Sequence, residues 1–350
     1  MLGCVKPLPA EDLDHVLQCT LPLWEQARGR RIFISGGTGF FGAWLLESLS
    51  YCNRKLNLNL SVTALTRNPI ALTRKLPHLA DDRSIVLLCG DVRNFSFPDG
   101  DFEYVIHGAA STSFDAASRP SELMSTIVQG TERMLAFAES HNARSFLFVS
   151  SGAVYGRQPE YLSHIPEDYL GGAACINPND AYGEGKRVAE QMCSRAAKES
   201  GMRTAIARGF AFVGPHLPLD QHFAIGNFIA DALADRNIAI KGDGTPMRSY
   251  LYAADLAVWL WTLLLRGDEG NENSIVINVG SGDAISIRDL AQQVVDEVNP
   301  SLRVEVAREP IHGASREQYV PSVTKAEARF GLRPLIGLRE AIRRTADWYR

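Results

Sequence analysis

The sequence predicts an α/β fold in which a parallel sheet is doubly wound by helices and is followed by a smaller C-terminal domain. Two observations support this prediction. Short apolar runs alternate with longer segments of helical periodicity, which is the pattern of strands and crossover helices in a parallel sheet. A glycine-rich turn follows the first apolar run directly and opens a helix, as at the ligand-binding edge of such a sheet.

This glycine-rich turn is the most informative motif of the chain. Residues 31–35 predict a buried strand, and Gly36, Gly39 and Gly42 follow before a helix over residues 43–48. Gly36 would let the chain turn sharply, Gly39 would let a pyrophosphate approach the backbone, and Gly42 would let the helix pack close to the strand. The helix N-terminus would offer N–H groups to phosphate oxygens. The motif therefore predicts a Rossmann-type dinucleotide site.

The end of the second predicted strand, residues 60–66, bears on the choice of dinucleotide. An NAD site usually carries an acidic residue here, and none is present. Arg67 would instead suit the 2′-phosphate of NADP, because a guanidinium matches phosphate geometry, although it could also be a solvated surface arginine. Arg74 and Lys75 are further candidates for this role. We expect NADP, or else NAD, as the cofactor.

Three more apolar runs, at residues 85–89, 104–107 and 145–150, predict the remaining strands of the first half. Small residues follow the middle run, where they would let a cofactor lie against the backbone. His107 ends that run and could serve as a base, but a packed, buried histidine is the expected outcome there. A further strand is expected over residues 206–213.

A tyrosine and a lysine four residues apart open the helix predicted from about residue 180 to residue 200. Tyr182 and Lys186 would share one helical face. A free tyrosine has a pKa of about 10, so it needs help to act as a base at neutral pH. A nearby ammonium and an oxidised nicotinamide would favour the phenolate. Ser151, at the end of the preceding strand, would bond the same substrate oxygen, which makes these three the candidate catalytic residues.

These motifs together resemble the extended short-chain dehydrogenases/reductases, in particular the nucleotide-sugar epimerase/dehydratase branch. The resemblance covers about residues 31–349. It rests on GGTGFFG at 36–42, GDVRN at 90–94, VIHGAAS at 105–111, SSGAVYG at 150–156, ARGFAFVGP at 207–215 and KGDGTPMRSYLYAADLA at 241–257. It implies that Ser151, Tyr182 and Lys186 are catalytic, that Asp91 and Val92 flank the adenine, and that Asn227 and Arg248 bind the substrate diphosphate. A structural salt bridge is the alternative for Arg248.

The predicted site residues divide into two groups, and no metal ligands are among them. Cofactor contacts are expected from Gly36, Thr38, Gly39, Phe40, Phe41, Gly42, Arg67, Asp91, Val92, Ala109, Ala110, Ser111, Tyr182 and Lys186. Contacts with a nucleotide-diphosphate sugar are expected from Ser111, Ser151, Asn227 and Arg248.

Several residues depart from the pattern of the related enzymes, and the two after Ser151 bear on the reaction. In that family, dehydratases carry an Asp-Glu pair after the catalytic hydroxyl residue and decarboxylases carry a glutamate, whereas Gly152 and Ala153 follow Ser151 here. Dehydration and decarboxylation are therefore disfavoured. The resemblance then implies an NAD(P)-dependent epimerase that works through a transient keto-sugar, with an NADPH-dependent 4-keto-sugar reductase as the alternative. A non-catalytic NADP-binding protein is less favoured, because the proton relay is complete.

Composition limits the class of protein. A chain of 350 residues with 45% hydrophobic and 22% charged residues is typical of a globular enzyme. The formal net charge of −4 gives no indication of a nucleic-acid or membrane partner, and six scattered cysteines favour free thiols in the cytoplasm. We expect an N-terminal extension over residues 1–28, a dinucleotide-binding domain over 29–205, and a mainly substrate-binding domain over 206–350, parts of which return to the first domain.

The helix predicted over residues 121–140 carries more apolar side chains than one face against a sheet requires. The next long helix offers Val188, Met192 and Ala196 as partners. In the family that the chain resembles, these two helices pair across a two-fold axis into a four-helix bundle. We therefore expect a homodimer with this isologous interface.

Overall fold

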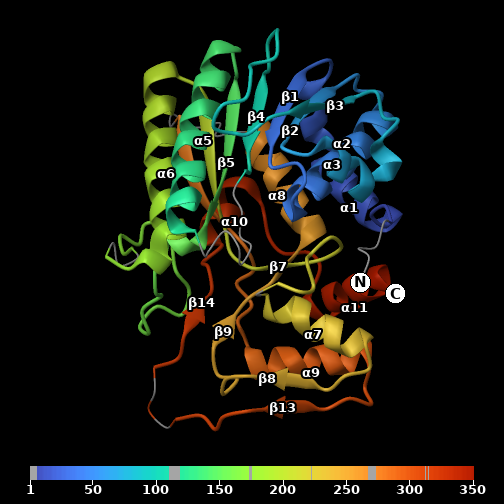
Figure 1. The fold of residues 1–350 in the computed structure, drawn as a ribbon, viewed down its shortest axis with the longest axis vertical. Coiled ribbons are helices and arrows are strands. Elements are labelled where there is room, and N and C mark those ends of the chain that lie inside the picture. The colour runs from blue at the N-terminus through green and yellow to red at the C-terminus, as the bar shows by residue number, and fades with distance from the viewer. Residues whose placement is uncertain are drawn as a thin grey trace.

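A seven-stranded sheet forms the centre of the molecule in the computed structural model, with strand order β11-β6-β5-β4-β1-β2-β3 (Figure 1). The structure describes residues 6–109, 119–172, 176–221, 223–266, 273–311, 313 and 315–350. The strands are β1 (Arg31–Ser35), β2 (Ser61–Thr66), β3 (Ile85–Cys89), β4 (Tyr104–His107), β5 (Ser145–Ser151), β6 (Arg203–Gly209) and β11 (Ser274–Val279). Every neighbouring pair of these strands is parallel, which confirms the predicted Rossmann-type sheet.

Helices cover both faces of this sheet. One face carries α1 (Ala10–Thr20), α2 (Phe40–Leu56), α3 (Pro69–Lys75) and α8 (Ala253–Arg266), and the other carries α5 (Pro120–Ser140) and α6 (Ala181–Ser200). The side chains of β1 show why both faces must be covered. Ile32 and Ile34 belong to the core under α2 and α8, whereas Phe33 belongs to the core under α5. Because successive side chains of a strand alternate between faces, a continuous apolar run requires two apolar layers.

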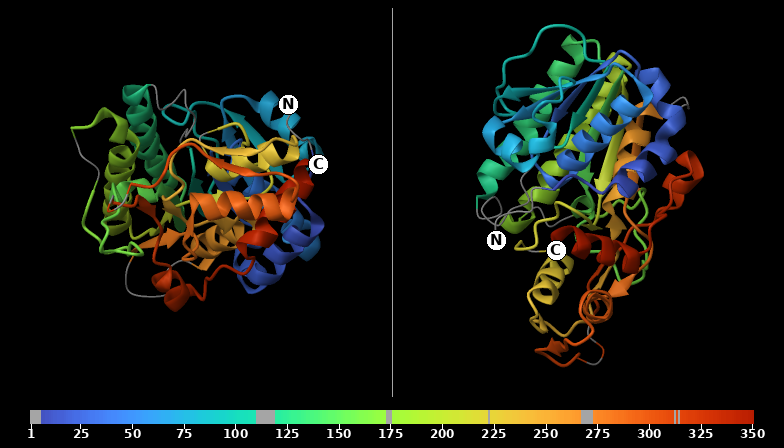
Figure 2. Two further views of the ribbon diagram at one scale, coloured as in Figure 1. Left: turned by 90° about the horizontal axis from the view of Figure 1, so that it is seen from below. Right: turned by 90° about the vertical axis from the view of Figure 1, so that its right-hand side faces the viewer.

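The later part of the chain forms a second group of elements at the lower end of the molecule (Figure 1, and right-hand view of Figure 2). Its strands are β7 (Phe212–Val213), β8 (Ile238–Ile240), β9 (Met247–Arg248), β10 (Leu251–Tyr252), β12 (Ile285–Ser286), β13 (Val304–Val306) and β14 (Gln318–Tyr319). Its helices are α7 (Ala224–Leu233), α9 (Ile287–Val298) and α11 (Leu338–Tyr349), whereas α10 (Thr324–Phe330) contacts β11 of the large sheet. The strands form three small sheets, of which β12-β9-β14 is the one that bears on the site.

Two predicted elements differ from the observed ones. The strand expected over residues 206–213 is interrupted, because Phe210 donates its N–H to Val279 and Ala211 accepts from Leu251, so that β7 leaves the large sheet and pairs with β10. Helix α2 is longer than predicted. It begins at Phe40, directly after the glycine turn, and ends at Leu56, where Asn57 adopts the left-handed conformation that closes many helices.

The residues before β1 are tied to the later part of the chain by buried charges. Asp12 accepts hydrogen bonds from the Tyr252 hydroxyl at 2.6 Å and from Arg344 Nη1 at 2.7 Å. His15 Nε2 lies 2.8 Å from Asp255 Oδ1. Both carboxylates are almost completely buried, so each must be compensated by such partners. Helix α1 is therefore an integral part of the fold.

Candidate active site

The turn after β1 has the close packing that its glycines allow. Gly36 has a φ of 84°, and a Cβ there would lie 2.6 Å from the carbonyl carbon of Gly108. A Cβ on Gly42 would lie 2.5 Å from the carbonyl oxygen of Gly36, whereas one on Gly39 would have only ordinary contact, at 3.5 Å, with that oxygen. Among the residues that the structure describes, no side chain caps the N-terminus of α2. An uncapped N-terminus beside an unobstructed backbone fits the pyrophosphate of a dinucleotide.

Three consecutive strands, β1, β2 and β3, bring further predicted cofactor residues to the same edge of the sheet. Arg67 follows β2 and is exposed, and Asp91 follows β3. Arg93 binds Asp91 through Nε at 2.8 Å and Nη2 at 3.0 Å, and this pairing lowers the pKa of the Asp91 carboxyl. Lys75, one of the further candidates, donates to the carbonyl oxygen of Thr38 at 2.9 Å. Lys75 thus places a positive charge beside the glycine turn, where its ammonium is hydrogen-bonded to the backbone.

The remaining predicted cofactor residues lie in different surroundings. Val92 is buried against α5, where a Cβ on Gly130 would lie 2.9 Å from it. Phe41 packs edge-on against Phe212, with 5.0 Å between the ring centroids. Ala109 directly follows β4, whereas Ala110 and Ser111 lie outside the described residues.

His107 is packed in the core, as expected. Its Nδ1 lies 2.8 Å from the Ser35 hydroxyl and its Nε2 lies 3.1 Å from the Thr131 hydroxyl. Burial, with the nearby charge of Lys186, lowers the pKa of His107 to about 3. The imidazole is therefore neutral at physiological pH and has a structural role.

Strand β5 and helix α6 bring the three predicted catalytic residues together. The Ser151 hydroxyl is hydrogen-bonded to the Tyr182 phenol. Lys186 is buried, donates to the carbonyl oxygen of Val149 at 2.7 Å, and lies 5.9 Å from the centroid of the Tyr182 ring. Burial lowers the pKa of Lys186 to about 8, so its ammonium is mostly retained at neutral pH.

The side chains around Tyr182 within the chain favour its protonated form. Burial raises the pKa of Tyr182, and the hydrogen bond with Ser151 offsets this only in part. Desolvation penalises the charged form of the phenol. Tyr182 therefore keeps its proton at neutral pH unless a further positive charge lies beside it.

A second phenol, which sequence analysis did not identify, reaches the same serine. Tyr319 of β14 is hydrogen-bonded to Ser151, and its ring packs against Phe210 with 4.7 Å between centroids. A Cβ on Gly152 would lie 2.7 Å from the Tyr319 hydroxyl oxygen and 2.9 Å from the Phe210 ring. The place of a side chain after Ser151 is thus filled from a distant part of the chain. No local pattern around Tyr319 signals this contact.

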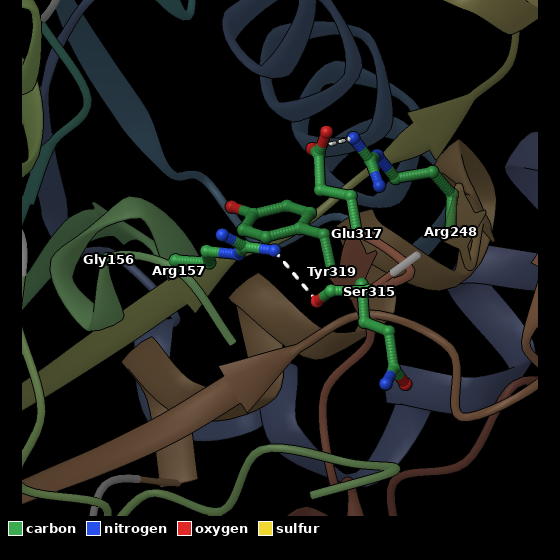
Figure 3. A pocket seen from close by; sticks show the side chains of 7 residues that line it. Gly156, Arg157, Arg248, Ser315, Glu317 and Tyr319 are labelled. Atoms are coloured by element: carbon green, nitrogen blue, oxygen red, sulfur yellow. Dashed lines mark hydrogen bonds and ion pairs between the residues drawn. The ribbon is translucent and has the colours of Figure 1, made fainter. Parts of the chain in front are cut away.

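A cavity of about 640 Å³ opens beside Tyr319 (Figure 3). Arg248 of β9 lines it and is ion-paired with Glu317, which is the structural salt bridge considered as the alternative for this residue. Arg157, also missed by sequence analysis, lines the opposite side and donates to the Ser315 hydroxyl at 2.8 Å. Asn227 lies on the exposed side of α7 and is not one of the lining residues.

Comparison with known proteins relates most of the chain to one group. A family model described as the NAD dependent epimerase/dehydratase family matches residues 32–280. UDP-glucuronic acid decarboxylase 5 of Arabidopsis thaliana is 31% identical over 313 residues, which cover 89% of this chain and 87% of the relative. UDP-glucuronic acid decarboxylase 1 of Xenopus tropicalis is 29% identical over 322 residues, which cover 92% and 72%.

Solved structures share the fold at lower identity. The UDP-glucose 4-epimerase of Thermotoga maritima, with UDP-glucose, has a TM-score of 0.74 and 21% identity, and the match covers 91% of this chain and 98% of that one. The UDP-glucose 4-epimerase of Thermus thermophilus, with NAD, has a TM-score of 0.72 and 22% identity, covering 91% and 99%.

Proposed function

We propose that this chain, which belongs to the NAD-dependent epimerase/dehydratase family, is a nucleotide-sugar epimerase that works through a transient keto-sugar. The observation that carries this proposal is the composition of the site around Ser151. A hydroxyl, a phenol and an ammonium suited to proton transfer lie together, and the next position holds glycine. Tyr319 and Phe210 occupy the space that an acidic side chain at Gly152 would need.

Each of these residues has a distinct task in this reaction. NADP or NAD, when bound at the glycine turn, would supply the hydride acceptor and later the hydride donor. Tyr182 takes the proton of the sugar hydroxyl and returns it, and Ser151 orients that oxygen by a hydrogen bond. The Lys186 ammonium, together with the positive charge of an oxidised nicotinamide, lowers the free energy of the Tyr182 phenolate. Arg248 would bind diphosphate oxygens after exchanging its Glu317 partner.

The sequence relatives suggest a different reaction, which the site residues disfavour. Those relatives are named UDP-glucuronic acid decarboxylases. In the family that the chain resembles, decarboxylases carry a glutamate after the catalytic hydroxyl residue, where this chain has Gly152 and Ala153, which have no acidic group. The relatives do indicate a suitable first substrate, since a uridine diphosphate sugar would fit a site with Arg248. UDP-glucuronic acid and UDP-glucose are therefore the two substrates to test.

A product analysis distinguishes epimerisation from both alternatives. Purified protein is incubated with each UDP-sugar, and separately with NADPH and a nucleotide 4-keto-sugar, and product mass, stereochemistry and the absorbance of reduced nicotinamide are followed. We expect a stereoisomer of unchanged mass with no net change in absorbance over many turnovers. Loss of carbon dioxide would identify a decarboxylase. Stoichiometric oxidation of NADPH with a 4-keto-sugar would identify the reductase, which uses the same proton relay.

We also propose that the protein prefers NADP, supported by the exposed Arg67 at the end of β2 and by the absence of an acidic residue in the sequence there.

A cytoplasmic location fits the four cysteines among the described residues, all of which are free thiols. In the described part of the chain, no helix is long and apolar enough to cross a membrane.

We also propose a homodimer through α5 and α6. Most apolar side chains of α5 are already buried within one chain: Leu123, Ile127, Met134, Leu135 and Phe137. Val188 of α6 is 45% exposed and is the clearest apolar residue left for a partner. Light scattering at micromolar concentration should give twice the mass of 38.5 kDa, and a monomer would contradict the proposal.

A further inference from the structure

Helix α6 presents a third residue on the face that carries Tyr182 and Lys186. Glu190 follows Lys186 by four residues, so the three form one stripe along the helix. The stripe contacts the end of β5 residue by residue. Tyr182 is hydrogen-bonded to Ser151, and Lys186 donates to the carbonyl oxygen of Val149. Glu190 accepts from the Ser150 hydroxyl at 2.5 Å. Residues 149–151, at the end of β5, thus each contact α6, and these contacts fix the position of Ser151 relative to the helix.

Glu190 is fixed in turn by Arg208 of β6. Arg208 Nε lies 3.0 Å from Oε1 and Nη2 lies 2.6 Å from Oε2, and both side chains are largely buried. A second branch of the guanidinium, Nη1, donates to the Tyr155 hydroxyl at 2.7 Å. Tyr155 in turn donates to Asn278 at 2.7 Å. A buried carboxylate with this many partners has little freedom to move.

We propose that Glu190 is a positioning residue of the active site, paired with Arg208, which holds Ser151 and Lys186 in line with Tyr182. This inference rests on the proposed function, because it assigns Glu190 a task in the same proton relay. Glu190 does not touch the reacting oxygen and acts through Ser150 and Lys186.

The charges around Lys186 make this role measurable. Glu190 and Cys193 of α6 raise the pKa of Lys186 and partly offset its burial, while His107 of β4 is neutral. Tyr182 stands on the same helix face, and Arg208 lies behind Glu190. Removing the carboxylate leaves the Arg208 charge unpaired and should lower the pKa of Lys186 further. Removing the guanidinium leaves the carboxylate unpaired and should raise it.

Two neutral variants should therefore shift the same titration in opposite directions. In Glu190→Gln we expect the Lys186 pKa, followed by NMR of 13C-labelled lysine, to fall by about 0.5 or more, and in Arg208→Gln we expect it to rise. The lysine signal that is missing from the spectrum of the Lys186→Arg protein is the signal of Lys186. This readout does not depend on the reaction, so it tests the charge arrangement even if the protein proves not to be an epimerase.

The activity of the same variants tests the positioning role. With the UDP-sugar that the wild type converts, we expect kcat of Glu190→Gln to fall about tenfold or more, the scale of a group that orients a site residue, with NAD binding unchanged. On the alkaline side of the pH profile, the activity of this variant should begin to fall at a lower pH than that of the wild type. Ser150→Ala, which removes one hydroxyl, should lower kcat without moving the titration and is available if the other variants fail to fold.

Asp255→Asn provides the matched control, because that carboxylate is also buried but is paired with His15 of α1 and not with the relay. It should lose thermal stability and keep the pH profile. The proposal is overturned if Glu190→Gln leaves the Lys186 titration and the pH profile unchanged, or if Asp255→Asn reproduces its effects.

Discussion

Replacing Gly42 by alanine should separate two tasks of the glycine turn, chain packing and cofactor binding. The new Cβ would lie 2.5 Å from backbone atoms of Gly36 and Gly37, whereas ordinary contact begins at 3.4 Å. The N-terminus of α2 must therefore withdraw by about 0.9 Å, since backbone atoms cannot rotate away. Overpacking of this kind costs about 1–3 kcal/mol, and the better helix propensity of alanine returns up to about 1 kcal/mol.

The same displacement should weaken cofactor binding. It moves the N–H groups of the first helical turn, and each lost hydrogen bond to a charged phosphate is worth about 1.5–3 kcal/mol. We expect the dissociation constant for NAD or NADP, measured by calorimetry, to rise about tenfold to a hundredfold. Thermal unfolding without cofactor should show a lower Tm.

Two further alanine variants are matched controls. Gly39→Ala should unfold like the wild type, because its Cβ would meet only one atom at 3.5 Å, yet it should bind cofactor at least about tenfold less tightly if the pyrophosphate lies there. Gly242→Ala should change neither property, since nothing lies within 4 Å of its Cβ. Normal cofactor affinity in Gly39→Ala would refute the placement of the pyrophosphate, and an unchanged Tm in Gly42→Ala would refute the packing argument.

Three other changes test separate parts of the molecule. Tyr182→Phe removes the transferable proton and should lower kcat by about 10²–10⁴ while cofactor titrations remain normal, and near-normal turnover would exclude the assigned role. Arg67→Asp should weaken NADP binding by about 1–3 kcal/mol and spare NAD, whereas an equal effect on both would make Arg67 a simple surface residue. The hydrogen bond with Asp255 raises the pKa of His15 from 6.5 to about 10, so its stabilising contribution is complete below pH 6.5 and is lost as pH rises towards 10. Melting curves should therefore show the wild type losing about 1.5–3 kcal/mol more than His15→Gln over that range, and parallel curves would disprove the ion pair's contribution.

The large sheet could be predicted because its strands are buried on both faces and therefore appear as uninterrupted apolar runs. The bounds of β1, β3 and β4 agree with the predicted ranges. The break between β6 and β7 could not be predicted, since Phe210 and Ala211 are as apolar as their neighbours. It arises from hydrogen bonds to Val279 and Leu251, which are remote in sequence.

The candidate site divides in the same way. Tyr182 and Lys186 were identifiable because four residues make one helical turn, and Ser151 because it ends a strand. Tyr319 was not, because it reaches Ser151 through the two-residue strand β14, whose pairing with β9 leaves no local signal. The sequence indicated that Gly152 has no acidic group where related enzymes carry one. The structure adds that Tyr319 and Phe210 fill the space that a side chain at Gly152 would need.

The contact between Asp12 and Arg344 also constrains how the protein is made. These residues are separated by 332 positions, and the ribosome releases the first long before the second exists. Before Arg344 is synthesised, Tyr252 is the one of the two observed partners that can bind the Asp12 carboxylate. Burying this carboxylate without a positive partner would be unfavourable. Helix α1 should therefore dock last, after the central sheet that it covers has formed during synthesis. A nascent chain arrested before Arg344 should accordingly expose α1 to proteases while β1 to β5 are already protected.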